Sequence, residues 1–172
     1  MSDSTIEIRR ADVADAETVM TMVREIATHE NQLQHVTVST ERWREFLKRD
    51  DVIVLLAERH GEAVGYVSCL RRLHLWSHRD VLALDDLYVR DGERDGGVGR
   101  RLMLALAEYA TPERLTITWG VEPENEAAQR FYRRLGAKLR PKVLASWAPR
   151  PSADRPEDTE AIRSLDRPQV ES

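Results

Sequence analysis

The stretch Val81–Ala110, VLALDDLYVRDGERDGGVGRRLMLALAEYA, decides the fold of this chain. It opens with the largely apolar run Val81–Val89, which predicts a strand. Four of the eight glycines follow within Asp91–Gly99. An amphipathic segment then continues to Ala110 with apolar residues at helical spacing. The stretch therefore predicts a strand, a glycine-rich turn and a helix in succession.

Segments of both kinds surround this stretch. Upstream, the patterns predict a strand at Ile6–Arg9, a helix capped by Asp12, a short helix capped by Thr40, and a hairpin over Val52–Leu70. Downstream, they predict a strand at Leu115–Val121, a helix at Asn125–Leu135 and one or two short terminal strands. The order β-α-α-β-β-β-α-β-α predicts a mixed α/β domain with a central, partly antiparallel sheet.

Length and composition fit one domain with a core, because 172 residues carry 41% hydrophobic and 33% charged side chains. The net charge of −4 disfavours a nucleic-acid partner, since such proteins usually carry a basic excess. The single cysteine, Cys69, cannot close a disulfide within the chain, and no cluster has metal-ligand spacing. Without a membrane-length apolar run or a signal-peptide pattern, we expect a cytoplasmic protein with neither a metal nor a membrane partner.

The composition changes near Pro149. Five of the seven prolines lie at or after position 141, among charged residues and few apolar ones. Such a stretch buries little apolar area. We therefore expect a domain over residues 1–148 and a proline-rich, charged tail over residues 149–172.

The glycine loop has the chemistry of an anion site. Glycines let backbone N–H groups approach a ligand closely, and a helix N-terminus carries partial positive charge. The loop departs from the P-loop because Val98 and Gly99 stand where Lys and Ser or Thr are required. It departs from the dinucleotide fingerprint because Leu102 replaces the third glycine. The loop supports neither ATP nor NAD, and a plain strand–helix turn is the alternative to an anion site.

The pattern Arg94-x-x-Gly97-x-Gly99, between a strand and a helix, resembles the pyrophosphate-binding motif of the GNAT superfamily of acyl-CoA N-acyltransferases. Three segments are most similar to the diamine (spermidine/spermine-type) acetyltransferases: Leu84–Val89, Asn125–Ala137 and Ile26–Glu30. The resemblance spans roughly Ile6 to Ala137. It implies a mostly antiparallel sheet flanked by helices, acetyl-CoA as cosubstrate, a small-molecule amine as acceptor and a homodimer.

The resemblance also implies residue roles. Asp85 matches a base or water-holding carboxylate, Asp86 a carboxylate that helps to bind the amine, and Tyr132 the acid that protonates the leaving thiolate. A base is needed because an alkylammonium, with a pKa of about 10.4, is not nucleophilic at pH 7. The implied acetyl-CoA contacts are Leu87, Tyr88, Val89, Arg94, Asp95, Gly96, Gly97, Val98, Gly99, Arg100 and Asn125. The implied acceptor contacts are Glu30, Asp85, Asp86 and Trp76.

The sequence leaves the identity of the acceptor and the type of activity open. Leu33 and Gln34 stand where the diamine enzymes have adjacent glutamates, so this chain attracts a polycation less strongly. A polyamine, an aminoglycoside or an amino acid such as a lysine analogue fits direct attack in a ternary complex. A non-catalytic acyl-CoA sensor and a protein N-acetyltransferase are the rival hypotheses. The intact carboxylate pair and Tyr132 argue against the sensor. The alternative to their catalytic roles is loop hydrogen bonding for the carboxylates and core packing for Tyr132.

Overall fold

A computed structural model describes residues 5–149 of the chain. Its helices and strands follow the predicted order β-α-α-β-β-β-α-β-α, which is thereby confirmed. The strands are β1 (Glu7–Arg10), β2 (Val52–Arg59), β3 (Glu62–Arg72), β4 (Val81–Val89) and β5 (Thr116–Thr118). The helices are α1 (Ala16–His29), α2 (Thr40–Phe46), α3 (Val98–Ala110) and α4 (Glu126–Arg134).

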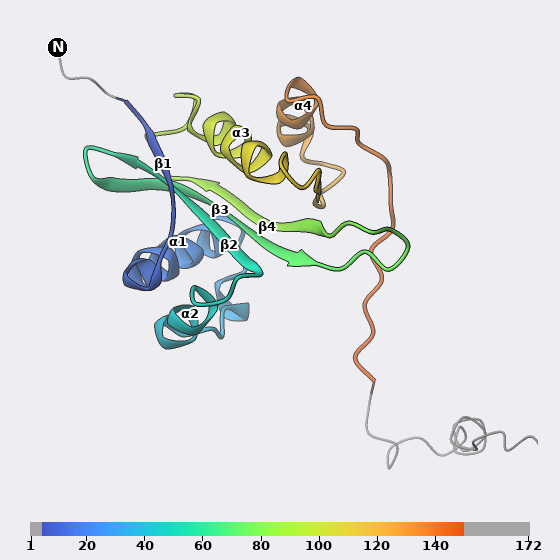
Figure 1. The fold of residues 1–172 in the computed structure, drawn as a ribbon. Helices are drawn as coiled ribbons and strands as arrows, with labels where there is room; N and C mark the ends of the chain where they lie inside the picture. The colour runs from blue at the N-terminus through green and yellow to red at the C-terminus, as the bar shows by residue number, and fades with distance from the viewer. Residues whose placement is uncertain (1–4, 150–172) are drawn as a thin grey trace, which may run out of the picture. The chain divides into compact units, whose positions relative to one another are not determined.

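The five strands form one sheet in the order β1-β2-β3-β4-β5. Every neighbouring pair is antiparallel except β4 and β5, which run parallel. Their pairing covers only Val81–Ala83 against Thr116–Thr118, so the rest of β4 has no strand paired on that side within the described chain. Helices α1 and α2 lie on one face of the sheet, and α3 lies on the other (Figure 1). The predicted mixed fold with a mostly antiparallel sheet is confirmed.

Both faces of the sheet are packed by helical side chains. Val19 and Met22 of α1 are fully buried in one cluster with Tyr66 of β3. On the opposite face, Leu102 and Leu106 of α3 are fully buried. Burial of an aliphatic side chain of this size contributes about 1.5–3 kcal/mol, so these amphipathic faces determine on which side each helix packs.

Side-chain caps mark where α1 and α2 begin. The Asp12 carboxylate accepts from the Ala14 N–H at 2.7 Å and caps the 3₁₀ turn that leads into α1, close to the predicted start. The prediction that Thr40 caps α2 is wrong, because Ser39, one residue earlier, accepts the Arg42 N–H at 3.1 Å. Either hydroxyl is chemically able to cap, and the extended backbone at Ser39 selects it.

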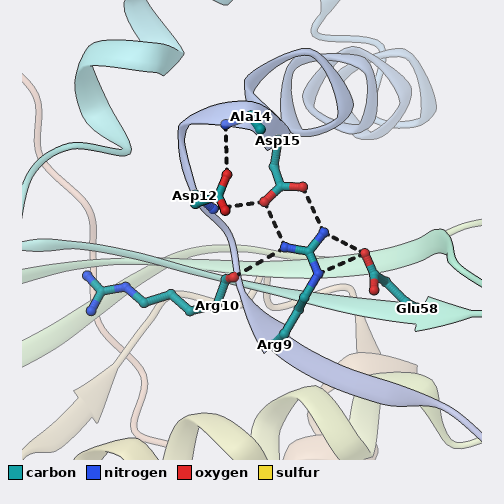
Figure 2. A network of polar contacts seen from close by, with 6 residues as sticks. All are labelled: Arg9, Arg10, Asp12, Ala14, Asp15 and Glu58. Atoms are coloured by element: carbon teal, nitrogen blue, oxygen red, sulfur yellow. Dashed lines mark hydrogen bonds and ion pairs between the residues drawn. The ribbon is translucent and has the colours of Figure 1, made fainter.

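A network of charged side chains fastens β1 to β2 and to the turn before α1 (Figure 2). The Arg9 guanidinium donates two hydrogen bonds of 2.7 Å to the Asp15 carboxylate. It also donates to Oε1 of Glu58 at 2.6 and 2.9 Å. The hydrogen bond from Arg9 holds the pKa of Asp15 below its ordinary value. Because the carboxylates reach Arg9 from two different elements, the network fixes the first strand at the sheet edge.

The chain divides into two compact units, Met1–Gly136 and Ala137–Ser172. In the second unit, residues 137–149 form neither helix nor strand, so the predicted terminal strands do not occur there. Pro141 and Pro149 lack the N–H groups that a strand ladder needs. The tail predicted over residues 149–172 lies outside the described residues apart from Pro149, and its boundary stays a prediction. No described helix combines the length and apolarity of a membrane span.

Candidate active site

A β-bulge in β4 separates two adjacent carboxylates. Ser68 pairs with Asp86, but the next residue, Cys69, pairs with Leu84, so Asp85 is the extra residue on β4. Burial, followed by the charge of Asp85, raises the pKa of the Cys69 thiol to about 12. Asp86 instead bonds to Ser68, whose side chain alternates with that of Cys69 along β3. The bulge therefore separates an Asp86 bonded to Ser68 from an Asp85 whose charge is felt by Cys69.

Asp86 is held by side chains of β3. The buried Tyr66 hydroxyl donates to Oδ2 of Asp86 at 2.9 Å. Oγ of Ser68 lies 3.5 Å from the same oxygen and accepts the Asp86 N–H at 3.2 Å. Burial and the neighbouring Asp86 charge raise the pKa of Tyr66, so its hydroxyl stays protonated and remains a donor.

Asp85 reaches solvent beside the unpaired part of β4. Partial desolvation, followed by the Asp86 charge, raises the pKa of Asp85 above its ordinary value. A raised pKa makes the carboxylate a stronger base than a free aspartate while leaving it accessible to a ligand.

The glycine loop opens helix α3 without a side-chain cap. Gly97 is the N-cap residue with a φ of 77°, a conformation that glycine adopts without strain. The first helical bond runs from the Arg101 N–H to the Gly97 carbonyl at 3.0 Å. The N–H groups of Val98, Gly99 and Arg100 lie before it and have no acceptor one turn earlier in the helix. Such a terminus is suited to bind an anion.

A cavity of about 590 Å³ adjoins this helix end. It lies among the last residues of β4, the glycine loop, the C-terminal end of α1 and helix α4. Ten residues expected from the sequence line it: Glu30, Leu87, Tyr88, Val89, Arg94, Asp95, Gly97, Val98, Gly99 and Arg100. Six expected residues do not line it: Asp85, Asp86, Gly96, Trp76, Asn125 and Tyr132.

Asn125 and Tyr132 both have structural contacts in α4. The Asn125 side chain caps the helix by accepting the Ala128 N–H at 3.0 Å. Tyr132 is buried, with its ring centroid 4.9 Å from that of Trp119 and 5.1 Å from that of Phe131. Burial raises the pKa of Tyr132, so its hydroxyl is protonated at neutral pH. Its neighbour Phe131, which is not among the contacts implied by the resemblance, lines the cavity.

Trp76 lies in the loop between β3 and β4 and is 95% exposed. Residues 81–86 of β4 lie between this loop and Leu87–Val89, the end of the same strand that lines the cavity. The structure therefore does not bring Trp76 to the cavity. Sequence similarity around a hairpin tip does not determine where the tip points, because the strand lengths on either side set its position.

Several cavity residues were not selected from the sequence: Ile26, His29, Glu93, Phe131, Arg134 and Leu135. Two of them carry a signal in the sequence: His29 as a rim or cap residue, and Arg134 in the run of Arg130, Arg133 and Arg134, from which one side chain could reach a CoA phosphate. His29 neighbours Glu30 at the end of α1, and Arg134 lies one helical turn after Phe131. The others come from elements whose packing, rather than whose residue type, brings them to the site.

The charges around the cavity are unequally paired. Glu93 pairs with Arg59 at 3.2 Å, and Arg94 pairs with Asp91 at 3.2 Å. Neither Arg100 nor Arg134 has an ion pair with any residue from 5 to 149. At the other side of the cavity, Glu30 follows α1, whose C-terminus carries partial negative charge. The cavity thus joins an anion-binding end to an end that favours cations.

Comparison with known proteins defines the class. Residues 20–137 match the model of the acetyltransferase (GNAT) family, and the chain belongs to this family. It is an N-acetyltransferase. The resemblance found in the sequence is confirmed at this level, while the closer likeness to diamine acetyltransferases is not shown.

Individual proteins support the same class. An uncharacterized N-acetyltransferase of Archaeoglobus fulgidus is 31% identical over 135 residues, which is 74% of this chain and 89% of that protein. The thialysine N-epsilon-acetyltransferase of Bos taurus is 28% identical over 144 residues, covering 77% and 84%. The structure of AAC(6')-Iy in complex with a CoA-containing bisubstrate analogue has a TM-score of 0.69 at 19% identity, covering 85% and 99%. That last likeness shows the shared fold.

Proposed function

We propose that this chain transfers an acetyl group from acetyl-CoA to a primary amine of a small molecule, by direct attack in a ternary complex. The observation that carries the proposal is the cavity itself. It connects the uncapped N-terminus of α3 with Glu30 and the unpaired end of β4. One end suits the diphosphate of coenzyme A, and the other suits a cationic acceptor.

The residues present fit coenzyme A. The N–H groups of Val98, Gly99 and Arg100 would bind the diphosphate oxygens. Arg100 and Arg134, which form no ion pair within the described chain, would add charge-assisted contacts to phosphate. In the acetylated form, coenzyme A supplies a thioester that an amine can attack. The CoA-containing analogue bound by AAC(6')-Iy is consistent with this assignment.

Asp85 would act as the base, directly or through a water molecule. The neutral amine nitrogen attacks the thioester carbonyl carbon, the new C–N bond forms, and the C–S bond breaks. Asp85 takes the proton that the amine loses, which its raised pKa favours. A backbone N–H within Leu87–Val89, on the part of β4 that no strand pairs, would stabilise the oxyanion.

Tyr132 would return a proton to the leaving thiolate. Burial keeps its hydroxyl protonated at neutral pH, as an acid requires. Its ring packs against Phe131, which lines the cavity, so Tyr132 lies one side chain away from the space proposed for coenzyme A. The helix cap made by Asn125 would keep the start of α4 in register for this contact with the CoA arm.

Glu30 and Asp86 would attract a cationic acceptor, because neither forms an ion pair with any described residue. An acceptor with a second amino group fits this pair of carboxylates. The bovine relative is named for acetylation of thialysine, and a solved structure of the same fold, meta-AAC0020, is an aminoglycoside acetyltransferase in complex with sisomicin. Polyamines belong to the same chemical class. A homodimer and a cytoplasmic location remain predictions.

Thiol release tests the proposal. Acetyl-CoA is offered with polyamines, aminoglycosides, lysine analogues and peptides, and free thiol is measured alongside calorimetry of CoA binding. We expect both binding and release with at least one small amine. Tyr132→Phe should lower kcat by about 100-fold or more, with Tyr109→Phe as the matched control. Binding without release would favour the sensor hypothesis, and release with peptides alone would favour a protein acetyltransferase.

A further inference from the structure

Ser68 is the single polar side chain of the described chain that is buried, at 5% exposure, apart from tyrosines. A buried hydroxyl is costly unless it is hydrogen-bonded. Ser68 lies opposite Asp86, at the last register pair before the bulge at Asp85. Its position therefore links a buried polar group to the residue proposed as the base.

The Ser68 hydroxyl contacts both the backbone N–H and the side chain of Asp86 on the neighbouring strand. Its Oγ accepts the Asp86 N–H at 3.2 Å and lies 3.5 Å from Oδ2 of Asp86. A bulge disrupts the local ladder of backbone hydrogen bonds, so the backbone N–H beside it needs another acceptor. Ser68 supplies that acceptor, and its register pair with Asp86 lies directly beside the bulged residue Asp85.

Tyr66 provides the second anchor from the same strand. It is fully buried, and its hydroxyl donates to Oδ2 of Asp86 at 2.9 Å. The other oxygen, Oδ1, has no hydrogen-bond partner in the part of the chain that the structure describes. Among the described residues, the buried side-chain polar atoms without a partner are Nε1 of Trp43 and Nε of Arg59, so Oδ1 of Asp86 is not a fully buried atom. Oδ1 is therefore open to solvent while Oδ2 is fixed.

We propose that Tyr66 and Ser68 are positioning residues for the acetyl transfer: Tyr66 orients the Asp86 carboxylate toward the acceptor, and Ser68 fixes the backbone at the bulge that contains Asp85, the proposed base. This inference rests on the proposed function. Oδ1 of Asp86 is available because Oδ2 receives the Tyr66 hydroxyl. The bulge at Asp85 keeps its position because the Ser68 hydroxyl accepts the N–H of the next residue, Asp86.

The two residues have different kinetic signatures. Tyr66→Phe keeps the buried ring and removes only the hydroxyl, so we expect the KM for the acceptor to rise about tenfold with kcat changed less than about twofold. Ser68→Ala should lower kcat about tenfold because it releases the bulge, and Ser68→Thr, which retains a hydroxyl, should restore it. The KM for acetyl-CoA should stay unchanged in all three.

A double-mutant cycle separates positioning from general damage to the fold. In an Asp86→Asn background, Tyr66→Phe should cause no further loss, because the carboxylate that it orients is gone. Tyr109→Phe serves as the matched control. Equal losses in kcat and in both KM values, additive losses in the cycle, or failure of Ser68→Thr to restore kcat would overturn the inference.

Amide hydrogen exchange provides a readout that does not need turnover. The Asp86 N–H should exchange about tenfold or more faster in Ser68→Ala than in the wild type, while amides of α3 keep their rates. Unchanged exchange at Asp86 would overturn the role of Ser68. If the wild type releases no thiol with any amine, the proposed function fails, and calorimetry with spermidine as the probe tests Tyr66. Equal binding by wild type and Tyr66→Phe, or no binding by the wild type, would overturn that role.

Discussion

Asp85 and Asp86 are neighbours in sequence but differ in their surroundings, because the register between β3 and β4 skips Asp85 and pairs Asp86 with Ser68. Asp86 is tied to Tyr66, whereas Asp85 reaches solvent. The charge of Asp86 nevertheless contributes to the raised pKa of Asp85, after desolvation. The pair therefore combines an anchored carboxylate with a solvent-accessible carboxylate of raised pKa.

This coupling predicts the acidic limb of the pH profile. The proposed base, Asp85, must be deprotonated to act, so kcat/KM should fall as the pH drops through its pKa, which lies above the ordinary 3.8. Asp86→Asn removes a negative charge and should move the midpoint to lower pH. Asp85→Asn should remove the limb together with most of the activity. A midpoint that Asp86→Asn leaves in place or raises would contradict the coupling.

Arg134 offers a test of the phosphate end. It lines the cavity without an ion pair among residues 5–149, so Arg134→Ala should weaken CoA binding roughly tenfold in calorimetry. The loss should shrink as salt is added, because part of the attraction is screened. Arg133→Ala is the matched control, since Arg133 is next in sequence, does not line the cavity and instead bonds to Gln129 at 3.2 Å. Equal losses in both variants would remove the specific role of Arg134.

At Gly65, strands β3 and β4 approach too closely to leave room for a side chain. A Cβ atom built at Gly65 would lie 2.6 Å from the Tyr88 carbonyl oxygen, and this backbone atom cannot rotate away. Gly65→Ala should therefore destabilise the fold by about 1–3 kcal/mol, measured by denaturant unfolding. Gly120→Ala, where no atom lies within 4 Å of the added carbon, should change stability by less than about 0.5 kcal/mol. A Gly65 variant as stable as the Gly120 variant would show that the strands separate easily.

The Arg9 network predicts a pH dependence of stability. The pKa of Asp15 is held low in the folded state by the hydrogen bond from Arg9. This stabilisation is therefore present above the unfolded pKa of about 3.9 and is lost as the pH falls toward the folded value. Arg9→Ala should cost roughly 1 kcal/mol at pH 7, because the Arg9 side chain is 41% exposed, and progressively less as the pH falls below the unfolded pKa of Asp15. A cost that stays constant with pH would assign the effect to packing of the Arg9 stem.

The sequence predicted the order of the elements because each has a local signal. The glycine loop, the apolar period of α3 and the turn between β2 and β3 all depend on neighbouring residues. The last strand is shorter than predicted, Thr116–Thr118 within Leu115–Val121, because its length depends on how far it follows β4. Local patterns do not contain that information.

The residues of the candidate site also fall into two groups, those predictable from local sequence and those that depend on packing. Ten expected residues line the cavity because they belong to one continuous strand–loop–helix segment, together with Glu30. The bulge at Asp85 depends on register with β3, and the approach of Arg134 depends on the packing of α4. Trp76 was selected by similarity alone, and its 95% exposure reflects a hairpin tip that extends away from the core.

The bare start of α3 has a practical consequence for anyone who handles this protein. Three amide groups beside a left-handed Gly97 offer the same hydrogen bonds to sulfate or inorganic phosphate as to a nucleotide diphosphate. Buffers and precipitants that contain those ions should compete with the cosubstrate and raise the melting temperature on their own. Affinities are therefore best measured in chloride, with sulfate added back as a competitor whose inhibition constant reports on this terminus directly.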